Sequence, residues 1–196
     1  MHPEIISISL FWFVAAYTPG PNNVVASYSG FNFGITKTIP HIFGVTLGFT
    51  SLVFFLTIGL INVFKLFPII QIVMKYLGTL FLIYLAYKIA SSTVSEEIKK
   101  ENPVKFIETF LFQYLNPKGV MVAIIVVSTY VELGENYINH ATQVILLAFL
   151  FSSTSITLWT FIGKFLRKFA TNEKFIKHFN YVMSVLLLLS IITFYI

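Results

Sequence analysis

Six long apolar stretches alternate with shorter polar ones along the whole chain. They cover approximately residues 5–30, 40–63, 70–91, 106–131, 139–162 and 179–196. Each is long enough to cross a bilayer as a helix, which takes about 20 residues. None shows the alternation of a membrane β-strand, and a helix satisfies its backbone hydrogen bonds internally, as lipid requires. The pattern predicts an all-α integral membrane protein of about six transmembrane helices.

The most polar stretch, 91–105, divides this single membrane domain (1–196) into two halves, 1–90 and 106–196. Three spans per half means that the halves insert with opposite orientation, so they are predicted to be inverted repeats. The first span of each half, which is the first or fourth helix of the chain, is broken by proline near its middle. Paired breaks at matching positions indicate the central site of a transporter, with chance alignment of two prolines as the alternative.

The composition supports a membrane location. Of the 196 residues, 57% are hydrophobic and 11% are charged, whereas soluble domains carry about 25% charged residues. The chain has no cysteine, which excludes disulfides, thiolate metal sites and thiol redox relays. The net charge is +5, but no basic patch lies apart from a span, so a nucleic-acid partner is not expected.

The distribution of basic residues predicts the orientation in the membrane. Ten of the 13 lysines and arginines fall in the first, third and fifth connections, and two fall on the opposite side. Because basic residues accumulate in cytoplasmic loops, the linker 91–105 is predicted to be cytoplasmic. Both chain ends are then predicted to lie outside.

The first helix break is dense in residues that interrupt helices. Proline lacks an N–H and clashes with the preceding turn, and glycine relaxes the backbone. Pro21 suits the first position of a new half-helix, whose free N–H groups and positive dipole end would face the membrane centre. A plain proline kink is the alternative. The break comprises Thr18, Pro19, Gly20 and Pro21, and Asn22 and Asn23 follow it with polar amides.

The second break repeats this logic. Asn116 can cap a helix and Pro117 can begin the next half-helix. Lys118 lies near the middle of its span, where a lysine costs about 2.5–3.5 kcal/mol or more, so it is expected to face a cavity rather than snorkel. Two half-helix N-termini and an ammonium would attract an anion such as a carboxylate. The predicted substrate site comprises Asn22, Asn23, Gln113, Tyr114, Asn116 and Lys118.

Other polar and aromatic residues give weaker signals. His41 and His140 open the second span of each half and are expected to anchor at the interface, with proton gating as the alternative. Trp12 is expected in an aromatic belt. Acidic residues are absent from the middle of the spans, so a proton carrier would be Lys118, a water chain or the cargo. No ATP-binding motif is present, and neither a metal nor another cofactor is expected.

The two breaks resemble the most recognisable motifs of the LysE/RhtB family of amino-acid exporters. These motifs are TPGPNN in the first span and the run Asn116, Pro117 and Lys118 in the fourth. The resemblance covers nearly the whole chain. The segments FWFVAAYTPGPNN, LGTLFLIYLAYKIASS and FQYLNPKGVMVAIIVVSTYV look most like the branch that exports cysteine and O-acetylserine, which Gln113 also favours.

The resemblance implies secondary-active efflux of cysteine-like or O-acetylserine-like amino acids from a bacterial cell. It places the chain in the inner membrane as a multi-pass proton antiporter, with an amino acid, the lipid bilayer and protons as partners. Export of homoserine, threonine or another neutral amino acid is the first alternative. A non-transporting assembly subunit is the second, and a homo-oligomer is left open. Because no intramembrane cluster of His, Asp or Glu is present, an enzyme is not expected.

Overall fold

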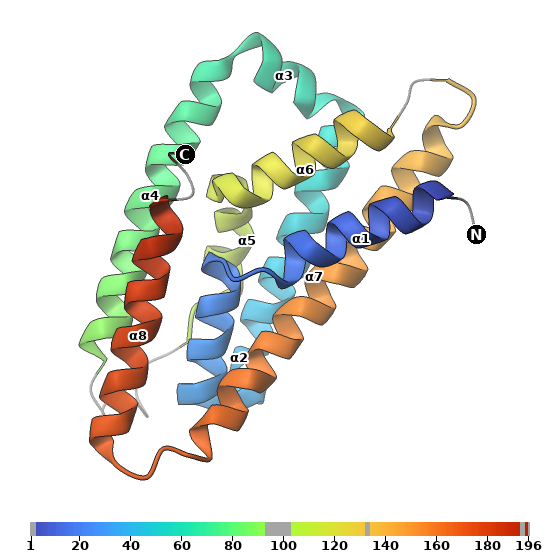
Figure 1. Cartoon of the computed structure of the whole chain (residues 1–196). Coiled ribbons are helices and arrows are strands. Elements are labelled where there is room, and N and C mark those ends of the chain that lie inside the picture. Colours follow the sequence, from blue (N-terminus) through green and yellow to red (C-terminus); the bar gives the residue numbers. More distant parts are fainter. Residues whose placement is uncertain (1–2, 93–102, 132–133, 193–194, 196) are drawn as a thin grey trace.

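The computed structural model describes residues 3–92, 103–131, 134–192 and 195, and these contain helices but no strand (Figure 1). The helices are α1 (Pro3–Tyr17), α2 (Pro21–Phe55), a π-helical stretch (Leu56–Leu60), α3 (Ile61–Leu66), α4 (Pro68–Ser91), α5 (Phe106–Leu115), α6 (Pro117–Tyr130), α7 (Tyr137–Arg167) and α8 (Glu173–Ile192). Most of the predicted linker 91–105 lies outside the described residues.

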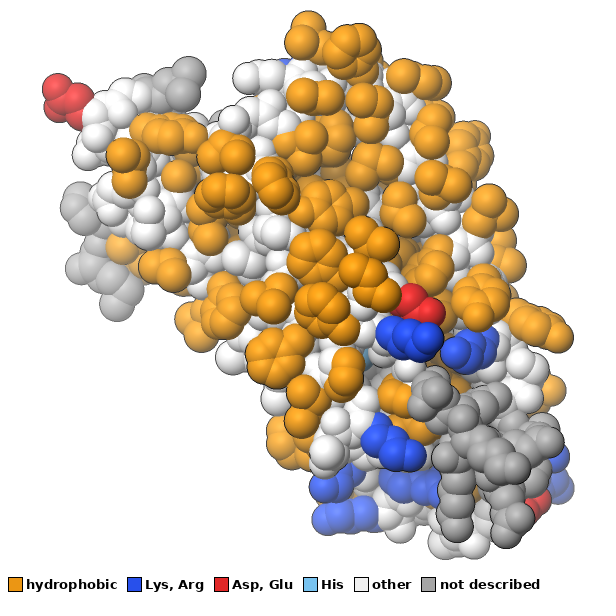
Figure 2. All heavy atoms as spheres, turned by 180° about the vertical axis from the view of Figure 1, so that it is seen from behind, with side chains coloured by type: hydrophobic (Ala, Val, Ile, Leu, Met, Phe, Trp, Pro, Cys, Tyr) orange, Lys and Arg blue, Asp and Glu red, His pale blue; other side chains and the backbone are white. Residues whose placement is uncertain are grey.

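Several of these helices can cross a membrane. By length and composition, four described stretches qualify: Pro21–Leu66, Pro68–Ser91, Tyr137–Arg167 and Glu173–Ile192. The pair α5 and α6 adds a fifth if the pair, bent by 61°, is one span, and α1 is apolar but shorter. Apolar side chains cover much of the face shown in Figure 2, away from its basic end. An all-helical, multi-pass membrane protein is therefore confirmed, while six spans in two inverted halves stay a prediction.

Helix α2 is not a straight rod, because it doubles back at Gly34. That residue has φ 77° and ψ 177°, a backbone conformation that glycine adopts readily and other residues rarely do. Ala26 and Val45 pack in one buried cluster, although a straight helix would separate them by about 28 Å. The chain thus forms two arms that run in opposite directions (Figure 1). We refer to residues 21–33 as the first arm and to residues 35–55 as the second arm.

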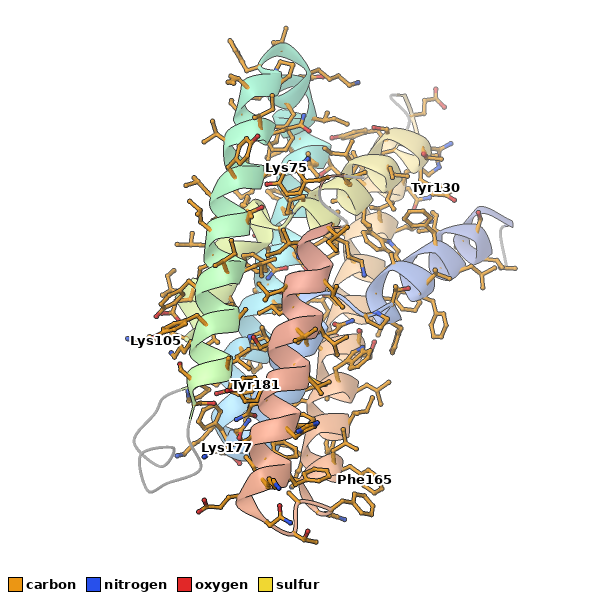
Figure 3. All side chains as sticks on the ribbon, turned by 60° about the vertical axis from the view of Figure 1, so that its left-hand side comes forward. Lys75, Lys105, Tyr130, Phe165, Lys177 and Tyr181 are labelled. Carbon is orange, nitrogen blue, oxygen red and sulfur yellow. The ribbon has the colours of Figure 1, made fainter. Side chains whose placement is uncertain are left out.

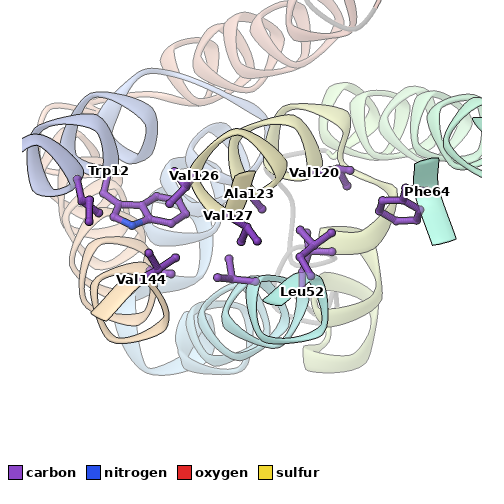
Figure 4. Packing of buried hydrophobic residues seen from close by; sticks show 12 residues of the cluster. Trp12, Leu52, Phe64, Val120, Ala123, Val126, Val127 and Val144 are labelled. Carbon is purple, nitrogen blue, oxygen red and sulfur yellow. The ribbon is translucent and has the colours of Figure 1, made fainter. Parts of the chain in front are cut away.

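The largest buried cluster joins α1, the second arm, α6 and α7 (Figure 4). Trp12 of α1 is 1% exposed, and Leu52, Ala123 and Val144 are completely buried. Lipid tails are as apolar as these side chains, so close van der Waals packing is what favours helix contact over lipid contact. This cluster holds in place α1, which precedes the first helix break, and α6, which follows the second.

Glycines allow the closest helix crossings. Gly30 in the first arm lies against the backbone of α7, and Gly163 in α7 lies against the backbone of the first arm. In the second arm, Gly44 and Gly48 lie against α5. Small residues at such positions let membrane helices pack closely. A Cβ at any of these four positions would collide with a neighbour. Both arms are consequently held tightly, one on α7 and one on α5.

Basic side chains gather at one end of the molecule (Figure 2). Lys105 and Lys177 lie at this basic end, and Lys75 lies toward the opposite end (Figure 3). The turn between the two arms of α2 is also at the basic end (Figure 1). Because basic residues accumulate on the cytoplasmic side, we predict that the basic end faces the cytoplasm.

Candidate functional site

The break between α1 and α2 is closed by polar groups around it. The side-chain amide of Asn23 donates hydrogen bonds to the carbonyl oxygens of Ala16 (2.9 Å) and Thr18 (3.0 Å). The hydroxyl of Ser155 on α7 also donates to the Ala16 carbonyl, at 2.7 Å. Since a broken helix leaves carbonyls without backbone donors, these side chains replace the lost bonds. Pro21 begins α2, as predicted.

Lys118, which follows the second break, reaches across to the first. Its Nζ donates to the carbonyl of Thr18 at 3.0 Å and to that of Pro19 at 3.4 Å. A Cβ on Gly20 would lie 3.1 Å from this Nζ, so the absence of a side chain at Gly20 gives the ammonium its space. The lysine head is therefore held between the two breaks and does not snorkel to an interface.

A pair of amides also joins the two breaks. Asn22 donates to the Gln113 side-chain oxygen at 2.7 Å, and Gln113 donates back to the Asn22 side-chain oxygen at 3.1 Å. Gln113 further donates to the carbonyl of Thr109 at 2.8 Å and is completely buried. Much of the hydrogen-bonding capacity of these two side-chain amides is thus used in the bonds between them.

The second break is a single residue, Asn116, between α5 and α6. Pro117 begins α6, as predicted, and Asn116 occupies the N-cap position. The predicted cap is wrong in one respect, because the Asn116 side chain makes no capping hydrogen bond. Its Oδ1 is buried and has no hydrogen-bond partner in the described part of the chain. An acceptor in this state is available to a ligand.

A cavity of about 80 Å³ lies between the two breaks. Of the predicted residues, it is lined by Gly20, Pro21, Asn22, Asn23, Gln113, Asn116 and Lys118. Tyr114 is not among its lining residues: its hydroxyl pairs with Ser51 at 2.8 Å, and it lines a separate cavity with α4 and Pro117. Thr18 and Pro19 contribute carbonyls to Lys118 and do not line the cavity. The structure therefore brings together most of the predicted site.

Trp12 is a cavity residue that the sequence did not reveal. Instead of lying in an interfacial belt, it lines the cavity at 1% exposure, and its indole Nε1 has no hydrogen-bond partner in the described ranges. Most buried polar groups in proteins are paired. The residues that line the cavity thus include Trp12 and Asn116, each with a buried unpaired polar atom, and Lys118 with its ammonium. Such a set complements a small solute with both an anionic and a cationic group.

Discontinuous helices that meet at a cavity, and contribute polar groups from their breaks to its lining, are the arrangement used by solute transporters. The chain belongs to the family of LysE type translocators, which it matches over residues 13–195. The resemblance seen in the two motifs is thereby confirmed. Members of this family are membrane transporters, not enzymes.

Relatives named for a specific cargo match almost end to end. A cysteine/O-acetylserine efflux protein of Salmonella choleraesuis (strain SC-B67) is 26% identical over 189 residues, which is 94% of this chain and 93% of the relative. A protein of the same name from Shigella flexneri serotype 5b (strain 8401) is 25% identical over 93% of this chain and 94% of the relative. No solved structure matches the chain.

Proposed function

We propose that the chain is a secondary-active exporter of cysteine, O-acetylserine and similar small amino acids across the bacterial inner membrane. The names of its relatives support the cargo class. The proposal rests on one observation. The same cavity is lined by Lys118, which carries an ammonium, and by Asn116, whose side-chain oxygen has no partner among the described residues. These two groups are complementary to the carboxylate and the ammonium that every free α-amino acid carries.

The proposed binding mode uses the open hydrogen-bonding capacity of the site. A lysine ammonium has three donors, and two of those on Lys118 are directed at the Thr18 and Pro19 carbonyls. The third can bind the cargo carboxylate, together with the indole N–H of Trp12. The cargo ammonium then donates to Asn116 Oδ1. Hydrogen bonds to ionised groups are roughly twice as strong as neutral ones, so these contacts favour a zwitterion over an uncharged solute.

The proposed architecture places this site at the centre of two inverted halves. Helix α1 and the first arm would form the first span, and α5 and α6 would form the fourth. Four more spans would come from the second arm with α3, and from α4, α7 and α8. With the basic end in the cytoplasm, both chain ends lie outside. Alternating access then requires the halves to rock about the cavity where their breaks meet.

A proton gradient is the proposed driving force, with inward protons exchanged for outward cargo. Homoserine, threonine or another neutral amino acid is the alternative cargo, since the groups described above recognise the backbone of any amino acid. A non-transporting assembly subunit is the weaker candidate, because the chain belongs to a family of translocators.

Transport by the purified protein in proteoliposomes tests the proposal. We expect counterflow of labelled, reduced cysteine and of O-acetylserine, with less or none for lysine. Lys118→Ala should abolish counterflow because the carboxylate loses its charged partner, while the protein remains folded. Lys75→Ala is the matched control: this lysine lies over the ring of Tyr195 at 4.0 Å and does not line the central cavity. Normal counterflow by Lys118→Ala, or counterflow of none of the amino acids by wild type, would contradict the proposal.

A further inference from the structure

His41 lies inside the protein, although its sequence position favoured an interfacial anchor. The side chain is 1% exposed, and no side chain among the described residues is hydrogen-bonded to its ring nitrogens. The polar group beside the ring is the backbone of Asn22, the residue that pairs with Gln113 at the cavity. An imidazole has two nitrogens that can form hydrogen bonds, so this one neighbour leaves part of that capacity unused. A buried, titratable ring in this position is therefore a candidate for a functional role.

Helical periodicity places His41 directly next to the cavity. It precedes Val45 by four residues, which is one turn on the same face of the second arm, and Val45 lines the cavity. Gly44, which immediately precedes Val45, lies against Thr109 of α5. The second arm leads from the turn between the two arms, which lies at the basic end (Figure 1), to Val45 at the cavity, and His41 stands between the two along the chain.

The charged groups on the surrounding elements do not neutralise this ring. They are Lys37 on the second arm, Lys105 at the N-cap of α5, Glu108 on α5, and Lys164 and Arg167 on α7, with Lys118 in the cavity itself. None of them is hydrogen-bonded to the ring, and the Glu108 carboxylate accepts a bond from the Lys105 backbone N–H at 2.8 Å. An imidazolium enclosed without a carboxylate costs free energy, so it belongs to a conformation in which water reaches the ring.

We propose that His41 carries the coupling proton of the transport cycle, an inference that rests on the proposed export function. A proton from the outer water binds a ring nitrogen when the empty carrier is open to the outside. The same proton leaves to the cytoplasm when cargo loads from inside, and the neutral ring accompanies the loaded carrier outward. One proton thus moves in as one amino acid moves out, and no bond other than N–H is made or broken.

Two features couple the ring to the cargo. First, the cargo ammonium and an imidazolium repel each other, and the repulsion is stronger in a low-dielectric interior than in water. Second, Asn22 contacts both regions, with its backbone beside His41 and its side chain bonded to Gln113. Histidine is also the side chain whose charge changes closest to neutral pH. Lys118, held by two carbonyls, acts as a fixed charge in this scheme.

The test separates proton coupling from cargo binding by comparing His41→Gln with wild type in proteoliposomes. Glutamine keeps a polar side chain but does not titrate. Counterflow of labelled cysteine needs no proton movement, and we expect it to persist in His41→Gln. Uptake driven by an imposed pH gradient should rise about fivefold or more in wild type and show no rise in the variant. The matched control is His140→Gln, at the corresponding position of the other half, which should behave like wild type.

The outcomes distinguish the two proposals. Absence of counterflow in wild type would refute the export function itself, whereas gradient-driven uptake by His41→Gln would refute only the role of His41. If His41→Gln fails to fold, His41→Asn takes its place, because its shorter amide does not titrate either. Gradient-driven uptake by His41→Asn would refute the role of His41, whereas loss of that uptake with counterflow retained would support it.

Discussion

The two helix breaks meet at one cavity, but they treat their exposed polar groups in opposite ways. The first break is three residues long, and side chains from three places close it: Asn23, Ser155 and Lys118 donate to carbonyls in the break or in the last turn of α1. The second break is one residue long, and the side-chain oxygen of Asn116 has no partner among the residues that the structure describes. A sealed break stabilises the fold, whereas an open break keeps binding capacity for a solute.

The contrast has a physical basis. A backbone carbonyl at membrane depth has no water to bond, so a break survives only where protein groups replace the lost bonds. The long break needs several donors, and two of them, Ser155 and Lys118, come from the other half of the chain. The short break exposes less backbone, and the Asn116 oxygen keeps its acceptor capacity within the described part of the chain. Four substitutions test this division of roles.

The largest effect is expected at the open break. Asn116→Leu removes the acceptor proposed for the cargo ammonium, and a hydrogen bond to a charged group contributes about 1.5–3 kcal/mol. Half-saturation of cysteine counterflow should therefore rise about 10- to 150-fold, while the melting temperature changes little because the oxygen has no protein partner. A large loss of thermal stability with unchanged affinity would show that Asn116 is structural.

At the first, sealed break we expect the opposite result, a loss of stability with little change in cargo affinity. Asn23→Leu removes two hydrogen bonds to carbonyls and should lower the free energy of unfolding by about 2 kcal/mol. Thermal unfolding in detergent measures this loss. Any protein that remains folded should bind cysteine with nearly wild-type affinity. A weakened affinity in a fully stable variant would instead make Asn23 a ligand of the cargo.

A smaller effect is expected from Gly20→Ala. The added Cβ would lie 3.1 Å from Lys118 Nζ and 3.2 Å from its Cδ, so the flexible lysine has to shift by a few tenths of an ångström. The backbone at Gly20 is extended, with φ −165°, and any residue adopts it. We expect counterflow to fall several-fold, corresponding to about 1 kcal/mol, without unfolding. Unchanged counterflow would mean that the ammonium position is not critical.

The smallest effect is predicted for Gly119→Ala, the counterpart on the open side. Its Cβ would find the Asn116 amide nitrogen at 3.6 Å and a ring carbon of Phe49 at the same distance, which is ordinary contact. Stability and counterflow should both stay within about 0.5 kcal/mol of wild type. A severe defect here would show that the open break tolerates no added volume.

The sequence predicted the breaks because their causes are local. Proline lacks an N–H wherever it stands, and Pro21 and Pro117 do begin helices. Which side chains form hydrogen bonds with each other was not predictable in the same way. Asn22 and Gln113 pair across 91 residues, and Tyr114, one position further along α5, contacts Ser51 outside the cavity. Adjacent helical positions differ by about 100°, so only the packing of α5 decides which one faces the cavity.

Burial was the harder property to predict. In a soluble protein, apolar positions mark the core, but here apolar side chains face both lipid and interior. Trp12 and His41 looked like interfacial residues because each lies near the end of an apolar stretch, yet both are 1% exposed. A signal existed for His41 in Gly44 and Gly48, which share its face of the helix and mark a close crossing. For Trp12 no comparable signal was present.

The turn at Gly34 has a mechanical consequence. A single residue joins the two arms, and no atom from elsewhere in the described chain lies within 4 Å of where its Cβ would be. A connection this short leaves the arms little freedom to pivot separately. The two arms are therefore expected to act as one rigid unit, which contributes Asn22 from the first arm and Phe49 from the second arm to the cavity. When the carrier rocks, this side of the cavity should move as a rigid body, and the hinge has to lie elsewhere.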